Sequence, residues 1–408
     1  MKFEPDRVKG FQDFLPPESL KRQAIRKVIE KWMQRFGFLP IETPIIEFEE
    51  LMHQNTQPNE QPDEAISDRF KLKDRGARNL GLRYEFTFQL ARIFKQNPTI
   101  KLPFRRYQIG EVFRDEPIGP NRFRQFTQCD ADIIGDPSPI ADTECLALVA
   151  AILNELRINA EIQVNNRKLL AAIIESVEIE HAQEVMKELD KIEKLGIDQT
   201  KIKLKRYATT NQIITLFKLL EKDISFFKEN AFAGTDELQE LIDHASLYNI
   251  KIKPNPSLAR GLSYYTGNIF EIKEQGKEAI AAGGRYDKTV GIYLGKEIPA
   301  VGISFGLERL TNRAALSYEK IPKVMIISIN QKEATIKLAK KLRSQNIATI
   351  IELNKTGKAL EYANAYTIPF VIFLGHEEIK QKKFKIREMS SGKESLLTEA
   401  QIIKAITK

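Results

Sequence analysis

The sequence predicts a multidomain α/β protein, and three features of the 408-residue chain indicate that architecture. Residues 104–134 form two extended segments joined by a turn, which predicts a β-hairpin. Residues 166–250 are rich in Lys, Glu, Leu and Ile and interrupt strand-rich sequence, as an inserted helical domain would. From residue 323 strands alternate with helices, which is typical of a small, mostly parallel α/β domain. We therefore expect a core in two parts, an insertion and a C-terminal domain, at residues 1–165, 166–250, 251–319 and 323–408.

The N-terminal elements follow from apolar spacing and from prolines. Residues 18–36 place apolar side chains three and four apart, which predicts an amphipathic helix. A proline pair precedes this helix and Gly37 follows it, which suits a helix start and a helix stop. Residues 38–47 have a strand pattern that Pro44 interrupts, as at a sheet edge or bulge. The polar stretch 53–64 predicts a loop.

Strand and helix patterns continue through the core and the tail. Residues 80–92 pass from a strand into a helix, residues 140–157 predict a helix, and residues 257–274 return to strands. A further strand runs into a helix near Gly306. In the tail we expect strands at 323–329, 347–353, 369–375 and 384–389, and helices at 333–346, 357–366 and 395–406.

The hairpin has two different faces, because side chains alternate along a strand. Its turn is predicted at residues 118–121, where Gly, Pro and Asn supply the necessary backbone angles. On the returning strand the polar face carries Arg124, Phe126, Gln128, Asp130 and Asp132, and the opposite, packing face carries Thr127, Cys129, Ala131 and Ile133. Arg114 and Glu116 share a face of the outgoing strand. The polar face fits either a solvated surface with cross-strand ion pairs or a floor that binds a substrate with anionic and cationic groups.

The composition limits the class of protein and the compartment in which it is expected. The chain is 42% hydrophobic and 29% charged, and no apolar run approaches the roughly 20 residues that span a bilayer. Acids and prolines occupy the N-terminus where a signal peptide needs an apolar core, so we expect a cytoplasmic protein without a membrane partner. Two cysteines and four scattered histidines give neither a disulfide framework nor zinc-ligand spacing.

The whole net charge of +8 lies in the last domain. Residues 323–408 hold 16 Lys and Arg against 8 Asp and Glu, and the rest of the chain is neutral. A basic module on a neutral body suggests a polyanion-binding appendage, although lysine-rich helix faces also serve solubility.

The sequence lacks the motifs of several common nucleotide-binding and catalytic sites. No phosphate-binding GxxxxGK[ST] loop, no GxGxxG dinucleotide motif and no Ser or Cys nucleophile elbow occurs. What remains is a set of single arginines on expected strands and turns: Arg83, Arg114, Arg122, Arg260, Arg285 and Arg309. Guanidinium groups hold phosphates and carboxylates bidentately, so this set suits a triphosphate on an open sheet. Taken singly, each arginine also fits an ordinary ion pair.

Six motifs carry a resemblance to one family. They are KGFQDFLPPE, GFLPIETPIIE, FRDEPIGPNRFRQFTQ, ARGLSYYTGNIFE, AAGGRYD and GISFGLERL, in that order over residues 9–310. The chain resembles the histidyl-tRNA synthetases: the second, third and sixth motifs are similar to class II motifs 1, 2 and 3, and the fourth and fifth to the two histidine-specific signatures. LRYEFT at residues 82–87 is closer to the archaeal and eukaryotic branch.

The resemblance implies a fold and a reaction. The fold would be the antiparallel-sheet catalytic core of class II synthetases with a helical insertion, followed by an anticodon-binding domain. Such an enzyme activates L-histidine with ATP to histidyl-adenylate and transfers histidine to the 3′ end of tRNA(His). Mg²⁺ would bridge the β- and γ-phosphates, the basic tail would hold the anticodon stem, and the helical insertion would clamp the acceptor stem. A homodimer with motif 1 at its interface is expected.

The resemblance also implies a role for each site residue. For ATP, Arg114 would bind the α-phosphate, Glu116 and Arg122 adenine and phosphates, Phe126 the purine ring, and Arg309 the γ-phosphate. For histidine, Glu85, Thr87 and Gln128 would receive the α-ammonium, and Asp132, Tyr264, Tyr265 and Tyr286 the imidazole. Arg260 would bind histidine and would be the family's distinctive catalytic arginine, placed against the α-phosphate on the side opposite Arg114, the other catalytic arginine.

Two departures and two alternatives stay open. Ser263 stands where the first histidine signature usually has an acid, and Lys288 where the second usually continues with Gly, so the shape of the histidine pocket is not fixed. The alternatives are a non-catalytic paralogue, such as the regulatory subunit of ATP phosphoribosyltransferase, and a tRNA-binding protein built on an inactive synthetase. The presence of the tail, Arg260 and Arg309 favours the enzyme.

Overall fold

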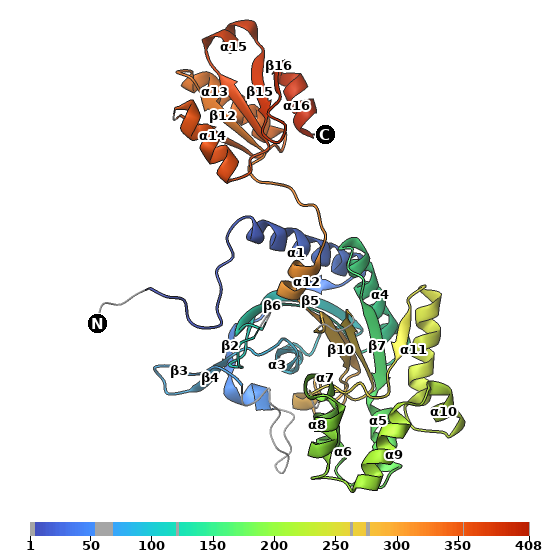
Figure 1. Cartoon of the computed structure of the whole chain (residues 1–408). Coiled ribbons are helices and arrows are strands. Elements are labelled where there is room, and N and C mark those ends of the chain that lie inside the picture. Colours follow the sequence, from blue (N-terminus) through green and yellow to red (C-terminus); the bar gives the residue numbers. More distant parts are fainter. Residues whose placement is uncertain are drawn as a thin grey trace. The chain divides into compact units, whose positions relative to one another are not determined.

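The computed structural model describes residues 5–53, 68–119, 122–261, 264–274, 278–353 and 355–407. They fall into two compact units, one made of Met1–Phe14 and Ile25–Leu316 and the other of Leu15–Ala24 and Ser317–Lys408 (Figure 1). Among these residues, no helix combines the length and the apolar composition that crossing a membrane would require.

The larger unit is built on an eight-stranded sheet. Its strands, in spatial order, are β1 (Leu39–Pro40), β5 (Phe104–Phe113), β6 (Gln125–Ile134), β11 (Ala300–Gly306), β10 (Ala281–Arg285), β9 (Asn268–Lys273), β7 (Glu161–Asn166) and β8 (Ile252–Pro254). Only the pairings at the two ends, β1 with β5 and β7 with β8, are parallel. The antiparallel core is thus confirmed, and it places the hairpin β5–β6 beside β11, which lies far along the chain.

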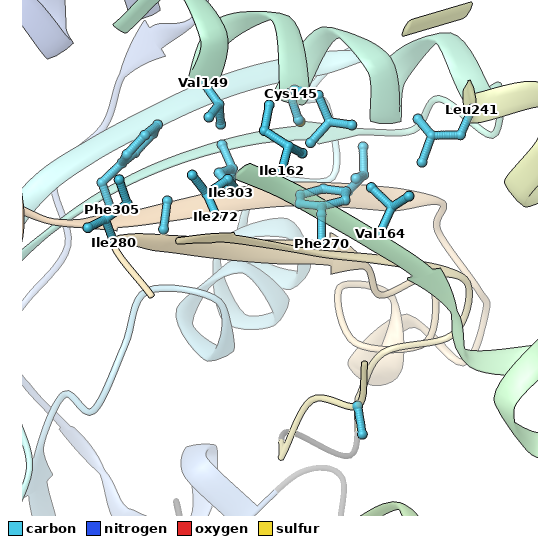
Figure 2. Packing of buried hydrophobic residues seen from close by; sticks show 14 of the residues in the cluster. Cys145, Val149, Ile162, Val164, Leu241, Phe270, Ile272, Ile280, Ile303 and Phe305 are labelled. Atoms are coloured by element: carbon cyan, nitrogen blue, oxygen red, sulfur yellow. The ribbon is translucent and has the colours of Figure 1, made fainter. Parts of the chain in front are cut away.

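The packing face of the hairpin lies against helices. Cys129, Ala131 and Ile133 of β6 are fully buried in one cluster with residues of α1 (Glu18–Arg35) and α4 (Pro139–Glu155). Figure 2 shows Cys145 and Val149 of α4 above side chains of the sheet strands, among them Phe270, Ile303 and Phe305. Because this face is filled by apolar packing, the polar side chains of β6 extend on the opposite face.

The expected inserted block is helical. It contains α5 (Arg167–Glu175), α6 (Ala182–Leu189), α7 (Ile192–Leu195), α8 (Ile197–Leu204), α9 (Thr210–Leu220), α10 (Ile224–Glu229) and α11 (Thr235–Leu247). The Asn166 side chain caps α5 by accepting a hydrogen bond from the Lys168 amide. Buried residues of these helices, such as Leu216 and Leu241, belong to the same hydrophobic cluster as the sheet. That this block is a domain of its own stays a prediction, because it lies in the same compact unit as the sheet.

The remaining described elements of this unit are a second, smaller sheet and four short helices. A three-stranded sheet is formed by β2 (Ile46–Phe48), β4 (Asn79–Leu82) and β3 (Lys71–Lys73), and the short helices are η1 (Glu49–His53), α3 (Phe88–Gln96), η2 (Ile292–Leu294) and α12 (Leu307–Arg313). Pro44 separates β1 and β2, which are edge strands of two different sheets; the edge was expected, the second sheet was not. Helix α1 ends before Gly37, which has φ +76°. The predicted loop 53–64 lies outside the described residues except for His53.

The C-terminal unit is an α/β domain, as predicted. It contains β12 (Val324–Ser328), α13 (Lys332–Ser344), β13 (Thr349–Glu352), α14 (Thr356–Ala365), β14 (Phe370–Leu374), α15 (His376–Gln381), β15 (Phe384–Glu388), β16 (Glu394–Leu397) and α16 (Glu399–Thr407). Parallel strands β13, β12 and β14 are extended by β15 and β16, which are antiparallel.

Two details of the tail differ from the prediction. The helix expected over 395–406 begins only at Glu399, because Glu394–Leu397 pair with β15 as a strand. Thr398 then caps the helix, exchanging hydrogen bonds with Gln401. Helix α15 was not expected, since its polar sequence has little apolar periodicity.

Candidate active site

A cavity of about 280 Å³ opens over the polar face of the sheet. It is lined by residues of β6, β10 and β11 and by the segments that precede α3, follow β5 and precede β9. All thirteen residues to which the resemblance gave a role line this cavity: Glu85, Thr87, Arg114, Glu116, Arg122, Phe126, Gln128, Asp132, Arg260, Tyr264, Tyr265, Tyr286 and Arg309. The fold therefore brings together residues from sequence segments that are more than 200 positions apart.

One part of the cavity is cationic. The Arg114 guanidinium lies over the ring of Tyr84 at 4.2 Å and over that of Phe126 at 5.1 Å from the ring centroids. The Glu116 carboxylate accepts hydrogen bonds from Arg122 Nε at 2.6 Å and from Tyr84 Oη at 3.1 Å. Phe126, expected to stack on a purine, is thus in contact with the guanidinium that precedes the turn.

Arg309 adds a further positive charge to this part. It lies on α12 directly after β11, donates to the Ala279 carbonyl and lies 3.7 Å from the Glu278 carboxylate. Burial lowers the pKa of Arg309, Glu278 counteracts that effect, and the positive charge of Arg114 lowers the pKa further. A cation whose pKa is lowered by a neighbouring cation favours a bound anion, because the anion relieves the repulsion between the two positive charges.

Another part of the cavity presents carboxylates and an amide. Glu85 Oε1 accepts a hydrogen bond from the Phe88 amide at 2.8 Å, and Oε2 accepts one from the Tyr264 hydroxyl at 3.3 Å. Burial raises the pKa of Glu85. Gln128 Nε2 donates to Ser304 Oγ at 3.1 Å, across the β6–β11 pairing. These groups can accept hydrogen bonds from an ammonium group.

Asp132 is held by two partners. Arg106 Nη2 lies 2.7 Å from its Oδ2, and the Tyr286 hydroxyl donates to its Oδ1. Burial raises the pKa of Asp132, and the charge of Arg106 opposes that rise. Arg106 is fully buried, and the motifs did not point to it because it precedes motif 2 in sequence. The register of the hairpin could have identified Arg106, because Arg106 and Asp132 are directly opposed in it.

Asp130 is a second residue to which the sequence gave no role. It lines the cavity between Gln128 and Asp132, and its Oδ1 is buried without a hydrogen-bond partner among the described residues. Burial raises the pKa of Asp130 to about 8, although the charge of Arg106 acts in the opposite direction. The alternation of β6 had placed this carboxyl on the polar face.

Arg260 reaches the cavity from the segment before β9. Its Nη1 donates to Glu271 Oε2 at 2.9 Å, and its Nε is buried without a hydrogen-bond partner among the described residues. Tyr264 and Tyr265 follow closely in the chain, and their ring centroids are 4.8 Å apart. The predicted catalytic arginine is therefore held at one nitrogen and directed into the cavity.

Two arginines of the set found in the sequence serve the fold instead. Arg83 donates to the carbonyls of Thr43 and Glu111, and Arg285 forms a buried ion pair with Asp142. Neither lines the cavity. Arg285 therefore forms the ordinary ion pair that a single arginine also fitted, whereas Arg83 binds backbone carbonyls, which was not expected.

Of the two departures from the family pattern, only Lys288 belongs to the described residues, and it does not line the cavity. Lys288 is exposed and lies 3.9 Å from Glu297, and Ser263 lies outside the described residues. Within the described part of the chain, no group of three or more His, Cys, Asp or Glu side chains could hold a metal ion by itself.

Comparisons with known proteins give one consistent result. Residues 10–310 match the family model described as Histidyl-tRNA synthetase, and residues 323–408 match the Anticodon binding domain. The chain is 37% identical over 418 residues to Histidine--tRNA ligase 1 of Bacillus cereus, covering 96% of this chain and 94% of that protein. It is 32% identical to Histidine--tRNA ligase of Korarchaeum cryptofilum, covering 91% of each.

Solved structures agree. The crystal structure of histidyl-tRNA synthetase from Nostoc sp. PCC 7120 superimposes with a TM-score of 0.86 at 25% identity, covering 100% of this chain and 99% of that one. An ATP phosphoribosyltransferase regulatory subunit/histidyl-tRNA synthetase from Bacillus halodurans C shares the fold, with a TM-score of 0.75 at 20% identity over 91% of this chain and 99% of that one.

Proposed function

This chain belongs to the histidyl-tRNA synthetase family and, as an enzyme of that family, ligates histidine to tRNA; on that basis we propose that its central cavity binds L-histidine and ATP and forms histidyl-adenylate. The observation that carries the proposal is the convergence on one cavity of all thirteen residues to which the resemblance gave a role. Its cationic part suits a triphosphate, and its carboxylates suit an ammonium and an imidazole.

The first step is an in-line displacement at phosphorus. A carboxylate oxygen of histidine attacks the α-phosphorus of ATP, the new O–P bond forms, and the bond to pyrophosphate breaks. Arg114 and Arg260 are the cations that would stabilise the negative charge on the α-phosphate as this happens, and Arg309 would hold the γ-phosphate. In the second step a hydroxyl of the 3′-terminal ribose of tRNA(His) attacks the carbonyl carbon of the adenylate, and AMP leaves.

The histidine end supplies specificity. Asp132, held by Arg106 and Tyr286, would accept a hydrogen bond from an imidazole N–H, with Tyr264 and Tyr265 beside it. A buried acceptor rejects isosteres without the N–H, because they leave it unpaired. The α-ammonium would be received by Glu85, Thr87 and Gln128.

Mg²⁺ would enter with ATP. This cation keeps several waters and typically binds through phosphates with one or two carboxylates, so the absence of a ligand cluster in the described residues is compatible with it. Glu278, which lines the cavity beside Arg309, is the carboxylate that would share it with the phosphates. The metal would neutralise charge on the β- and γ-phosphates.

The other partners rest on surface features. The net charge of +8 in residues 323–408 supports binding of the anticodon stem, and the helical block 166–250 would clamp the acceptor stem. Exposed apolar residues near motif 1 support a homodimer that covers them: Leu39, Ile45, Ile46, Phe48 and Leu72 are between 39% and 58% exposed. We place the enzyme in the cytoplasm, where its tRNA substrate is found.

Pyrophosphate exchange tests the proposal directly. The full chain is incubated with ATP, labelled pyrophosphate and each of the twenty amino acids in turn, and incorporation of label into ATP is measured. Exchange with histidine alone is expected. Silence with histidine would overturn the proposal, and tRNA binding without exchange would instead favour a non-catalytic paralogue or a tRNA-binding protein.

A further inference from the structure

A line of alternating charges joins the helical block to Arg260. Glu193 of α7 forms an ion pair with Lys273 Nζ, which also lies 3.4 Å from Glu271 Oε1. Glu271 Oε2 in turn accepts the hydrogen bond from Arg260 Nη1 at 2.9 Å. Lys273 and Glu271 both lie on β9, two positions apart, so their side chains share one face of the strand.

The middle of this line is buried and the outer end is not. The side chains of Lys273 and Glu271 are 11% and 13% exposed, whereas that of Glu193 is 61% exposed. None of the three lines the substrate cavity. Two largely buried opposite charges hold each other in place, and each would be costly to leave unpaired. The pair therefore fixes where Glu271 presents its second oxygen to the guanidinium.

The helical block also contacts the backbone next to Arg260. The Asp190 carboxylate, at the end of α6, lies so close to Gly261 that a Cβ atom there would be 2.8 Å from Asp190 Oδ2. Two acidic residues of the block, Asp190 and Glu193, thus meet the Arg260 segment and the charges behind it. Both lie within four residues of chain, at the junction of α6 and α7.

We propose that Glu271 and Lys273 are positioning residues that hold the Arg260 guanidinium for the adenylation step. Glu271 fixes one nitrogen and leaves the remainder of the guanidinium directed into the cavity, and Lys273 shares the Glu271 charge so that the carboxylate stays in place. The helical block sets this arrangement through Glu193 and Asp190. The inference rests on the proposed catalytic role of Arg260, and it adds residues that never touch substrate.

The test is the kinetics of histidine-dependent pyrophosphate exchange in the full chain. Glu271→Gln should lower kcat at least tenfold while the KM values for histidine and ATP change less than twofold. Glu193→Gln should lower kcat roughly two- to fivefold, the effect of a largely exposed ion pair, and Glu193→Lys should lower it further. Glu184→Gln, an exposed site on the neighbouring α6, is the matched control and should leave kcat unchanged. In a Lys273→Met background, Glu193→Gln should have no further effect.

These variants distinguish a positioning role of Glu271 and Lys273 from no such role. Wild-type kcat in both Glu271→Gln and Glu193→Lys, or a rise in KM that accounts for the whole loss, would overturn the positioning role. Because Glu193 is largely exposed, its variants test the idea even if Lys273→Met does not fold. Arg260→Ala separates the two proposals: if it retains exchange, the catalytic role of Arg260 fails, and if it loses exchange while Glu271→Gln is fully active, only the positioning inference fails.

Discussion

The Arg106 guanidinium lies 2.7 Å from the Asp132 carboxylate, and the two side chains are 0% and 5% exposed. The residues are directly opposed on β5 and β6, so the hairpin itself sets this ion pair. Because Tyr286 takes the other carboxylate oxygen, Asp132 is oriented before any substrate binds. The part of the cavity that we propose binds histidine is therefore preorganised by a residue outside the family motifs.

Replacing Arg106 should damage both folding and histidine binding. Arg106→Met keeps much of the side-chain volume but leaves Asp132 buried without its counter-charge, which costs about 3–5 kcal/mol when a buried pair loses one member. We expect a loss of unfolding free energy of that order in urea denaturation and a large rise in the KM for histidine. Arg105→Met is the control, because Arg105 pairs with Glu144 on the other face, where both side chains are partly exposed. Equal losses in the two variants would contradict the role of Arg106.

The alternation of side chains along β6 predicted which residues line the cavity, but it did not predict which side chains they pair with. Parity correctly separated Cys129, Ala131 and Ile133, which are buried in the core, from Gln128 and Asp132, which line the cavity. The pairing with Arg106 depends on the hairpin register, and a slip of one residue would have moved every partner to the other face. The resemblance supplied the proposed roles, and the fold brings the residues that would perform them to one cavity.

Gly302 provides the space that Asp132 occupies. A Cβ atom at this position of β11 would lie 2.0 Å from Asp132 Oδ1 and 3.3 Å from the Ala131 carbonyl oxygen. Since Arg106 and Tyr286 hold the carboxylate, it cannot move away cheaply. Gly302→Ala should therefore weaken histidine binding at least about tenfold, or roughly 1.4 kcal/mol, in a titration of histidine. Gly306→Ala on the same strand is the control, because its nearest new contact would be an ordinary 3.7 Å. An unchanged histidine affinity in Gly302→Ala would refute this steric argument.

The arginines show where single residues mislead. Six arginines suited a triphosphate in sequence, but Arg285 is taken by the buried Asp142 and Arg83 by two backbone carbonyls. Without the resemblance to motifs 2 and 3, the residue type and the strand pattern do not distinguish these two from Arg114 or Arg309. The difference lies in tertiary partners, which the three-dimensional arrangement of distant segments determines.

Asp130 should make stability depend on pH. Its pKa is raised to about 8 in the folded chain, whereas its ordinary value is 3.8, so between these pH values only the folded state holds the proton. This contribution to stability is fully present below the unfolded pKa and is lost as pH rises through about 8. Asp130→Asn removes it, so the unfolding free energy of the variant relative to wild type should rise between about pH 6 and pH 9. Urea denaturation at both pH values measures the difference, and the exposed Asp243→Asn serves as control. A pH-independent difference for Asp130→Asn would contradict the raised pKa.

Arg260→Ala should separate binding from chemistry. The guanidinium is expected to act on the α-phosphate as charge develops, so its loss should slow adenylation by orders of magnitude. Histidine affinity, measured by equilibrium titration, should remain largely intact, because Asp132 and Glu85 would carry that binding. An equal loss of affinity and rate would mean that Arg260 supports the structure of the pocket rather than the reaction.

The C-terminal unit should bind unpaired bases of tRNA through an exposed pair of aromatic side chains. Tyr362 lies on α14 and Tyr366 is the C-cap of that helix. Their ring centroids are 4.5 Å apart, and they are 42% and 55% exposed. Exposed aromatic rings in a domain of net charge +8 can stack unpaired bases while lysines neutralise the backbone, and each stacked base contributes about 1–3 kcal/mol. Tyr362→Ala with Tyr366→Ala should therefore raise the KM for tRNA at least about fivefold in aminoacylation and leave pyrophosphate exchange unchanged. Leu396→Ala on β16 removes a similarly exposed apolar side chain and should leave the KM for tRNA unchanged. A wild-type KM for tRNA in the double tyrosine variant would contradict the stacking role of this pair. The C-terminal domain would then bind tRNA without these two rings.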